Sequence, residues 1–494
     1  MNRHTSIAQL QSEKEFDICI IGGGATGLGI AVDAANRGYK TILLEQSDFA
    51  KGTSSRSTKL VHGGVRYLQQ GNIKLVMEAL KERGRLLKNA PHLVHNQQFI
   101  VPNYKWWEKP FYGVGLKIYD WMAGRLGLGP SQFLSKQEVI EKVPGLDENG
   151  LNGGILYHDG QFDDARLAIA LMQTAVQKGA TMLNYFSVNR LLKINQQVGG
   201  VGVKDMFTGN EYEIKSKVII NATGVFVDAI MKMDNPKHEN IVSPSQGIHL
   251  VVDKDFLNTN TAIMIPKTDD GRVLFAVPWH TKVVLGTTDT PVDKIVTEPE
   301  ALDTEKEFIL KHIGRYLAKD PTAADVRSVF AGLRPLVKGN TKNTAALSRE
   351  HFISISSTGM ITITGGKWTT YRKMAADVLH IAAQKNNLPP VKCSTQNLPL
   401  AGATNTIIPA DISNATNEEI AAMVKIAVHE EWCQTVEDFL SRRTRQLLLD
   451  VAVAKAKAPL VAKLLAIELN KDVHWVNDQI IIFNQIADGY TMKG

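Results

Sequence analysis

A segment near the start of the chain is rich in side chains that bind anions. Residues 52–68, GTSSRSTKLVHGGVRYL, contain three glycines, six hydroxyl groups, three cationic side chains and one histidine, and no acidic residue. Hydroxyl groups and cations donate hydrogen bonds to phosphate or sugar oxygens, and a following helix N-terminus adds a favourable dipole. We therefore expect an anionic ligand at Ser54, Ser55, Ser57, Thr58 and Lys59. A capped helix start with a solvated basic face is the alternative.

The preceding residues 16–45, FDICIIGGGATGLGIAVDAANRGYKTILLE, predict a strand, a tight turn, a helix and a second strand. Gly22, Gly24 and Gly27 have the G-x-G-x-x-G spacing, which permits the turn, the approach of backbone to a pyrophosphate, and close packing of helix on strand. The helix N-terminus offers N–H groups to the phosphates. Glu45, 18 residues after Gly27, is placed to accept hydrogen bonds from a ribose. The pattern predicts a dinucleotide site; a glycine-rich turn in another α/β protein is the alternative.

Length and composition restrict the class of protein. A chain of 494 residues is expected to form two or three domains. The 56 basic and 50 acidic residues give a net charge of +6, which mildly favours anionic partners. The basic residues form no long run, so nucleic acid is the least favoured of these partners. Cys19, Cys393 and Cys433 lie far apart, so we expect no zinc site or disulfide framework and a reducing cytoplasm. No segment reaches the roughly 18 apolar residues of a transmembrane helix.

Further blocks along the chain resemble the FAD-dependent glycerol-3-phosphate dehydrogenases of the aerobic, quinone-linked type. The resemblance begins near residue 16, includes the hydroxyl-rich segment and its His-Gly-Gly, and continues to at least residue 380. The order and spacing of the blocks make it specific. The later blocks are DDARL at 163–167, NATGVFVD at 221–228, GTTDT at 286–290, AGLRPL at 331–336, LSRE at 347–350 and GGKWTTYRKMA at 365–375.

The resemblance implies an α/β plus α+β fold: a Rossmann-like FAD domain, an antiparallel β substrate domain of the D-amino-acid-oxidase type, and an α-helical C-terminal domain. It also implies non-covalent FAD, and no metal site is expected. Period-two patterns at GIHLVVD, RVLFAVPW and TKVVLGTTD predict strands of the substrate domain, and TNEE at 416–419 predicts a capping box. The expected division is FAD domain 15–85, 150–240 and 345–385; substrate domain 86–149 and 241–344; linker 386–415; helical domain 416–494.

The cofactor-binding residues follow from the fingerprint and from the matched blocks. Gly63 and Gly64 would leave room for backbone beside a planar ring, and Gly366 precedes a helix whose N-terminus would face developing negative charge on the flavin. For the later glycines, ordinary turns are the alternative. The complete predicted set is Gly22, Gly24, Gly27, Glu45, Ser54, Ser55, Thr58, Lys59, His62, Gly63, Gly64, Val188, Ala222, Thr223, Gly224, Gly332, Gly366 and Thr369.

Oxidation of glycerol 3-phosphate removes a hydride from C2 and a proton from its hydroxyl group, with FAD as the hydride acceptor. The resemblance assigns substrate binding to Arg66, Tyr67, Arg349 and Lys367, and catalysis to His249 and Arg334. Histidine suits proton acceptance, and arginine suits a phosphate or a developing alkoxide. Taken singly, each cation could be a surface group and His249 a buried structural histidine. The identity of the base is left open.

Residues 104–128, YKWWEKPFYGVGLKIYDWMAGRLGL, mix aromatic and basic side chains. This composition is typical of the boundary between lipid headgroups and acyl chains, so we expect peripheral attachment to an anionic membrane surface on the inner face of the cell membrane. Attachment would bring the enzyme to a lipid-dissolved quinone. A buried patch under the substrate domain or at a homodimer contact is the alternative.

Three other functions compete with this interpretation. The first is a glycerol-3-phosphate oxidase that uses oxygen, and the second is an amine or amino-acid oxidase of the same fold. Four predicted cations favour a phosphate over a carboxylate substrate. The third is an FAD-dependent tRNA-modifying protein, which the absence of a basic and aromatic nucleic-acid surface disfavours. The electron acceptor, the oligomeric state and the role of the C-terminal helices stay open.

Overall fold

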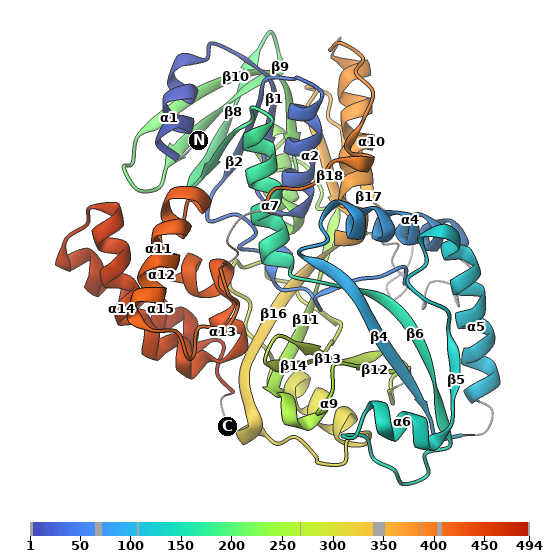
Figure 1. Ribbon diagram of the computed structural model, residues 1–494. Helices are drawn as coiled ribbons and strands as arrows, with labels where there is room; N and C mark the ends of the chain where they lie inside the picture. Colours follow the sequence, from blue (N-terminus) through green and yellow to red (C-terminus); the bar gives the residue numbers. More distant parts are fainter. Residues whose placement is uncertain are drawn as a thin grey trace.

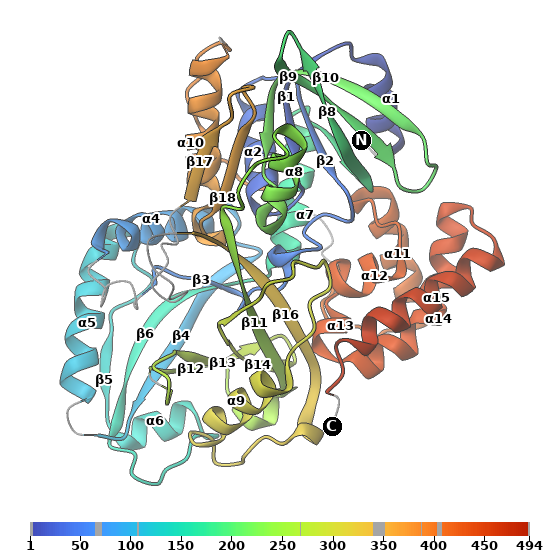
Figure 2. The ribbon, with the colours of Figure 1, turned by 180° about the vertical axis from the view of Figure 1, so that it is seen from behind.

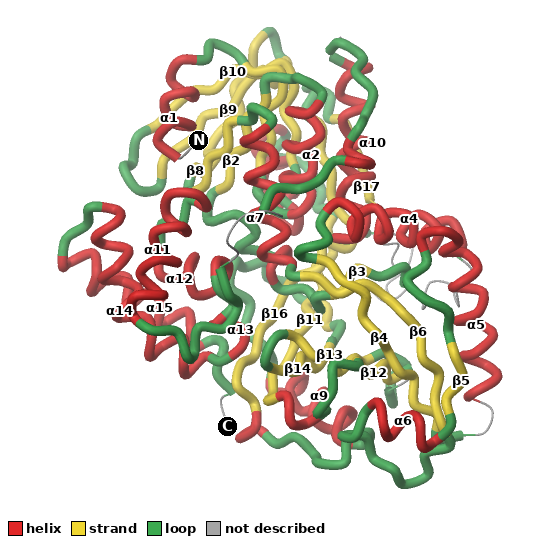
Figure 3. The backbone as a smooth tube through the Cα atoms, in the orientation of Figure 1, coloured by secondary structure: helices red, strands yellow, loops and turns green. Residues whose placement is uncertain are grey.

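The computed structural model describes residues 3–64, 72–105, 108–266, 268–338, 351–386, 388–402 and 408–492. The described chain forms two sheets with their covering helices and a separate group of C-terminal helices. In Figure 1 the first sheet lies above the second, and the red C-terminal helices lie beside both. Figure 3 separates the strand-rich centre from its helical cover. The Rossmann-like sheet, the second sheet and the C-terminal helices that the sequence predicts are therefore present.

The first sheet has the strand order β17-β18-β10-β1-β2-β7. All neighbours pair in parallel except β17, which is antiparallel to β18. Ile18, Cys19 and Ile20 are fully buried because helices cover both faces, which is why this strand is an uninterrupted apolar run. The strands are β1 Phe16–Ile21, β2 Thr41–Glu45, β7 Thr181–Asn184, β10 Glu211–Asn221, β17 His351–Ile355 and β18 Ile361–Gly365. Strand β9 Gln197–Asp205 pairs antiparallel with β10, and β8 Phe186–Ile194 pairs antiparallel with β9.

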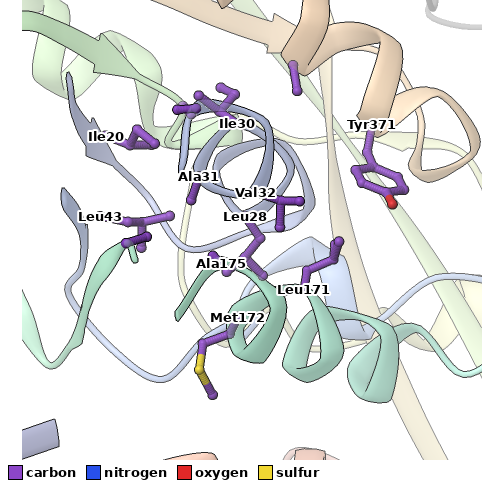
Figure 4. Packing of buried hydrophobic residues seen from close by; sticks show 14 of the residues in the cluster. Ile20, Leu28, Ile30, Ala31, Val32, Leu43, Leu171, Met172, Ala175 and Tyr371 are labelled. Carbon is purple, nitrogen blue, oxygen red and sulfur yellow. The ribbon is translucent and has the colours of Figure 1, made fainter. Parts of the chain in front are cut away.

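Three helices cover one face of this sheet: α2 Ala25–Asn36, α7 Asp164–Gln177 and α10 Tyr371–Lys385. Their apolar side chains interlock with those of β1 and β2 (Figure 4). Gly29 allows α10 to approach α2, because a Cβ there would lie 2.6 Å from the Tyr371 ring. On the other face, α1 Arg3–Ser12 and α8 Val227–Asp234 contribute Leu10 and Ile230 to a second core. Helix α8 is visible in Figure 2, which views the molecule from behind.

The second sheet has the order β15-β11-β14-β13-β12-β4-β6-β3, with β16 added to β11 and β5 to β6. Its pairs are antiparallel except β12 with β4. Because β3 and β6 belong to it, the chain passes between the sheets several times. The strands are β3 Leu60–Val61, β4 Val94–Asn103, β5 Gln132–Leu134, β6 Gly153–Phe162, β11 Val242–Asp253, β12 Ala262–Ile265, β13 Leu274–Trp279, β14 Lys282–Gly286, β15 Thr290–Pro291 and β16 Val326–Val337.

Helices α4 Ile73–Asn89, α5 Glu108–Ala123, α6 Lys136–Lys142 and α9 Asp303–Gly314 pack around this second sheet. The strands predicted at GIHLVVD, RVLFAVPW and TKVVLGTTD are confirmed as β11, β13 and β14. The turn between β13 and β14 contains His280, which has the left-handed φ of 53°.

The C-terminal helices are α11 Asn417–Glu431, α12 Val436–Asp438, α13 Gln446–Leu449, α14 Val451–Leu469 and α15 Val473–Asp488. The predicted capping box is confirmed, because Thr416 Oγ1 accepts from the Glu419 amide while the Glu419 carboxylate accepts from the Thr416 amide. These helices share a core with Val251 and Phe330 of the second sheet. Within the described ranges, no helix combines the length and the hydropathy needed to cross a bilayer.

Candidate active site

A cavity of about 520 Å³ lies where the carboxyl ends of β1, β2 and β10 meet strands β11 and β16 of the second sheet. Ligands of open α/β sheets bind at this edge. Of the predicted site residues, those that line the cavity are Gly22, Gly24, Glu45, Ser54, Thr58, His62, Val188, Ala222, Thr223, Gly224, His249, Gly332, Arg334, Gly366, Lys367 and Thr369.

The glycine turn after β1 forms one end of the cavity. Gly22 has a φ of 108°, and a Cβ on it would lie 2.7 Å from the Ala222 carbonyl oxygen, so only glycine fits without strain. Gly24 is the N-cap of α2 and provides no side-chain cap. Gly24, Ala25 and Thr26 at the start of the helix line the cavity. Ser54 Oγ accepts from the Ala25 amide at 2.9 Å, which links the hydroxyl-rich segment to this helix N-terminus. The arrangement suits a pyrophosphate.

Glu45 ends β2 beside this turn. One carboxylate oxygen accepts from the Gly23 amide at 2.7 Å and the other from the Ser47 amide at 2.8 Å. Burial raises the pKa of Glu45, and the two backbone N–H groups oppose that rise. Each oxygen keeps a further lone pair, so an oriented acceptor lies where a ribose hydroxyl would sit.

The opposite end of the cavity is closed by the residues before α10. Gly366 has a φ of 71°, and a Cβ there would lie 2.4 Å from Met374 Sδ. Trp368, in the short 3-10 turn η7 Trp368–Thr370, donates its indole N–H to the Ser54 carbonyl at 2.8 Å. Thr369 reaches the His62 carbonyl at 3.4 Å. These contacts hold the Gly-Gly-Lys turn against the hydroxyl-rich segment and leave Lys367 on the cavity wall.

His249 extends from β11 into the cavity and is 2% exposed. Its Nε2 lies 2.9 Å from Thr58 Oγ1, and its ring stacks on Phe330 with centroids 4.8 Å apart. Nδ1 is buried and has no hydrogen-bond partner in the part of the chain that the structure describes. Burial, helped by the charges of Lys59 and Arg334, holds the pKa of His249 well below its usual value. The ring is therefore neutral at physiological pH and able to accept a proton.

Arg334 on β16 lies beside His249. Its guanidinium donates to the carbonyls of Gln246 and Thr288 at 3.2 and 2.8 Å and to Thr287 Oγ1 at 3.1 Å. A Cβ on Gly247 would lie 2.1 Å from Arg334 Nη2, so the guanidinium lies flat on glycine backbone. These contacts fix its orientation at the cavity wall. Arg334 also pairs with the Asp289 carboxylate at 3.3 Å. The guanidinium, fixed in this way beside a neutral imidazole, can bind an anion while the imidazole takes a proton.

Several predicted residues lie behind the cavity wall. Lys59 is fully buried, and its ammonium contacts both Asp164 carboxylate oxygens at 2.8 Å and the Ser55 carbonyl at 2.7 Å. It therefore anchors the hydroxyl-rich segment to α7 rather than facing a ligand, which differs from the sequence-based expectation. A Cβ on Gly27 would lie 1.9 Å from the Gly22 carbonyl oxygen, and the Gly63 amide donates to Tyr119 Oη.

Ser55 and Gly64 also do not line the cavity. The predicted substrate residues Arg66, Tyr67 and Arg349 lie outside the described residues.

Two cations on the cavity wall were not predicted as site residues. Arg56 donates to Glu298 at 2.6 Å, and Lys51 contacts Glu437 at 2.5 Å. Both lie in or next to the hydroxyl-rich segment, and that position could have marked them as site residues. Their pairing with carboxylates could not be predicted, because those partners are far away in the sequence.

Two family models match the chain. The model described as FAD dependent oxidoreductase matches residues 17–372, and the model described as C-terminal domain of alpha-glycerophosphate oxidase matches residues 409–475. Among curated relatives, the mitochondrial glycerol-3-phosphate dehydrogenase of Macaca fascicularis is 39% identical over 97% of this chain and 74% of its own. That of Schizosaccharomyces pombe is 41% identical over 82% of this chain and 67% of its own.

Solved structures give the same grouping. The glycerol-3-phosphate dehydrogenase of Bacillus halodurans, complexed with FAD, aligns with a TM-score of 0.80 at 29% identity, covering 99% of this chain and 97% of its own. The L-alpha-glycerophosphate oxidase of Mycoplasma pneumoniae, with FAD bound, aligns with a TM-score of 0.59 at 17% identity over 80% of this chain and 97% of its own. The second likeness concerns the fold alone.

Proposed function

Because the chain belongs to the FAD-dependent glycerol-3-phosphate dehydrogenase family, we propose that its cavity binds FAD between the glycine turn and His249, and that the reduced flavin passes its electrons to a quinone. The enzyme oxidises sn-glycerol 3-phosphate to dihydroxyacetone phosphate. The observation that carries the proposed geometry is that one cavity joins the dinucleotide fingerprint to a neutral histidine and an oriented arginine.

The residues fit FAD. The Gly22 turn leaves no room for a side chain, the α2 N-terminus and its partner Ser54 lie on the cavity wall, and Glu45 presents an oriented acceptor to a ribose. At the far end, Gly366 and Gly332 bring backbone close to the cavity. Flavin supplies the acceptor for the hydride that leaves C2 of the substrate.

The protein residues then have two tasks. Arg334 and Lys367 are placed to bind the dianionic substrate, and Arg334 to stabilise negative charge on the C2 oxygen as its proton leaves. His249 is placed to accept that proton, because burial keeps its imidazole neutral. Thr58 Oγ1 contacts Nε2 at 2.9 Å and so fixes the orientation of the ring.

Glu45→Ala is expected to weaken FAD retention, because the variant loses the ribose acceptor and leaves the Gly23 and Ser47 amides without it. The expected change is about tenfold in the FAD dissociation constant, with a nearly normal KM in molecules that keep FAD. Flavin fluorescence released on dilution and gel filtration measures it. Glu13→Ala, which removes a surface carboxylate paired with Lys40, is the control. Full flavin occupancy of Glu45→Ala after gel filtration would count against this role.

A quinone acceptor requires access to lipid, and we propose that α5 provides it. Val114, Ile118 and Trp121 are 62%, 44% and 82% exposed and recur at helical spacing, and Phe133 of β5 adds 49%. The four side chains line one shallow groove, with Lys117 between them. An amphipathic helix of this kind can lie in the interface of a bilayer.

The aromatic side chains of this segment divide between two environments. Tyr119 is 1% exposed and donates to Asp159, so it belongs to the interior rather than to the surface predicted from composition. Trp106, Trp107 and the Phe111 side chain lie outside the described residues. The proposal of membrane attachment therefore rests on Val114, Ile118, Trp121 and Phe133.

A combined Val114→Ser, Ile118→Ser, Trp121→Ser variant is expected to lose binding to anionic liposomes, because it removes the apolar stripe of α5 and no buried group. Flotation at low salt measures the bound fraction. Ile467→Ser, Ile481→Ser, Ile482→Ser removes equally exposed side chains from α14 and α15 and serves as the control. If the α5 variant floats as well as the wild type, or the wild type does not float, the attachment proposal is wrong.

The choice of acceptor is tested on the reduced enzyme. After anaerobic reduction, mixing with a short-chain quinone is expected to reoxidise the flavin faster than mixing with oxygen at equal concentration. Faster reoxidation by oxygen would identify an oxidase instead.

A further inference from the structure

The C-terminal helices contact the loop that follows β2 through a group of buried charges. We call this group the Asp48 cluster. It contains three carboxylates and three cations: Asp48, Glu437, Asp438, Lys51, Arg442 and Arg443. All except Lys51 are at most 6% exposed, and Asp48, Asp438 and Arg443 are fully buried.

Asp48 is the centre of the cluster. Arg443 donates to both of its carboxylate oxygens, and Arg442 donates to one of them through Nε. Arg442 also donates to Glu437 at 2.6 Å and to Asp438 at 2.9 Å. The two arginines are consecutive and lie in a π-helical turn, η9 Phe439–Arg443. The wider turn directs both guanidinium groups to the same carboxylate, and π-helical turns occur often at functional sites.

The loop that carries Asp48 has two faces. Gln46, Ser47 and residues 50–54 line the FAD cavity. Asp48 and Phe49 point the other way, and the Phe49 ring packs against Trp432 at 5.9 Å. The backbone is tied on the same side, because the Ser47 carbonyl accepts from the Tyr185 amide at 2.9 Å while Tyr185 Oη donates to Asp438 at 2.6 Å.

Lys51 connects the two faces. It lines the cavity, and its ammonium contacts Glu437 of the C-terminal segment at 2.5 Å. Glu298 lies 3.5 Å from the same ammonium and also pairs with Arg56 on the cavity wall. Among the described residues, the side-chain contacts of Asp48 and Lys51 therefore run to the C-terminal segment or to residues bonded to it.

We propose that the C-terminal helical domain positions the FAD-binding loop, with Asp48 as the positioning residue through which residues 436–443 set the affinity for FAD. The inference rests on the proposed placement of FAD in the cavity. Among the described residues, removing the Asp48 charge would leave the buried Arg443 guanidinium with only the more distant Glu431 carboxylate, at 3.8 Å, while Arg442 keeps Glu437 and Asp438. The loop would have to move to let water reach Arg443. Glu45 and Ser47 move with that loop, so their contacts to FAD would weaken. Because coupling between two sites is reciprocal, FAD should in turn stabilise the C-terminal segment.

The test compares two matched aspartate variants of the holoenzyme. Asp48→Asn is expected to raise the FAD dissociation constant about tenfold or more, measured by flavin fluorescence on dilution, and Asp48→Glu to restore part of the affinity. Asp33→Asn breaks another buried aspartate–arginine pair, with Arg37 at the far end of α2, and should leave FAD affinity unchanged although it lowers stability. Equal affinity in Asp48→Asn and wild type, or an equal loss in Asp33→Asn, would overturn the inference.

A second measurement needs no variant. Hydrogen–deuterium exchange of the wild-type chain with and without FAD should show slower exchange in residues 436–445, which do not line the cavity, as well as in residues 22–27 and 45–58. Protection of the lining peptides alone would overturn the coupling while leaving the FAD site in place. Absence of protection in the lining peptides would contradict the proposed FAD placement itself.

Discussion

His249→Ala is expected to lower kcat about a hundredfold or more while FAD stays bound, because the variant lacks the proposed proton acceptor. His249 is 2% exposed on a strand of the second sheet and is not itself one of the predicted FAD-binding residues, although its partner Thr58 is one. Its loss therefore removes no predicted FAD contact directly. Steady-state turnover of sn-glycerol 3-phosphate with an artificial electron acceptor measures kcat, and the flavin absorption spectrum measures occupancy.

The control for this variant is His429→Ala, an exposed histidine on α11 that pairs with Glu468. The pH profile provides a second check. Since burial lowers the pKa of His249, the ring stays neutral as the pH falls below the usual histidine value of 6.5, and the activity that depends on it is lost only at lower pH. Turnover of His249→Ala equal to that of the wild type at every pH would remove this residue from the mechanism.

Arg334→Met is expected to lower kcat/KM about a hundredfold or more, because it removes the group that we propose to bind the substrate and to stabilise the C2 oxygen. Arg334→Lys should recover only part of this loss, since an ammonium cannot reproduce the forked contacts to Thr287, Thr288 and Gln246. Initial rates over a range of substrate concentrations separate the effect on KM from that on kcat.

Arg327→Met is the matched control, because Arg327 lies on the same strand, β16, and pairs with Asp253 at the surface. Its kinetics should match those of the wild type. An Arg334→Met enzyme with unchanged kcat/KM would show that the guanidinium contacts neither substrate nor transition state.

The parts of the molecule that the sequence predicts well depend on contacts between residues close in the chain. The strand, turn and helix around Gly22 and the acceptor at Glu45 belong to one local unit, so glycine spacing and hydrophobic runs were sufficient to place them. The capping box at Thr416 is local in the same way. FAD as cofactor and the fold class are likewise confirmed by the family models and the related structures.

Other features depend on partners that are distant in the sequence. Lys59 lies in a segment whose composition predicts anion binding. Its ammonium nevertheless lies in the interior, because it pairs with Asp164, 105 residues away. Tyr119 lies in a segment whose composition predicts contact with a membrane surface. Its hydroxyl group nevertheless lies in the core, where it donates to Asp159 on β6. A buried charge is stable only when paired, and local patterns do not reveal which distant group will pair with it.

The Asp48 cluster could not be predicted from local patterns either, because its members come from different domains. The Arg442–Arg443 pair is unremarkable in the sequence, and Asp48 is one acid in a loop after a nucleotide-binding strand. Only the fold brings them together across 394 residues. The resemblance to a known family places His249 and Arg334 in one site for the same reason, since it carries information about the fold that spacing alone does not.

The central claim is that this cavity brings C2 of glycerol 3-phosphate to a bound flavin beside His249 and Arg334. The most direct test is rapid anaerobic mixing of the FAD-loaded enzyme with sn-glycerol 3-phosphate carrying hydrogen or deuterium at C2, followed through the visible absorption of the flavin. We expect the absorption to bleach in a single turnover, more slowly with deuterium, and to stay unchanged with glycine or sarcosine. A flavin that stays oxidised with glycerol 3-phosphate, or that glycine or sarcosine reduces equally well, would contradict the account.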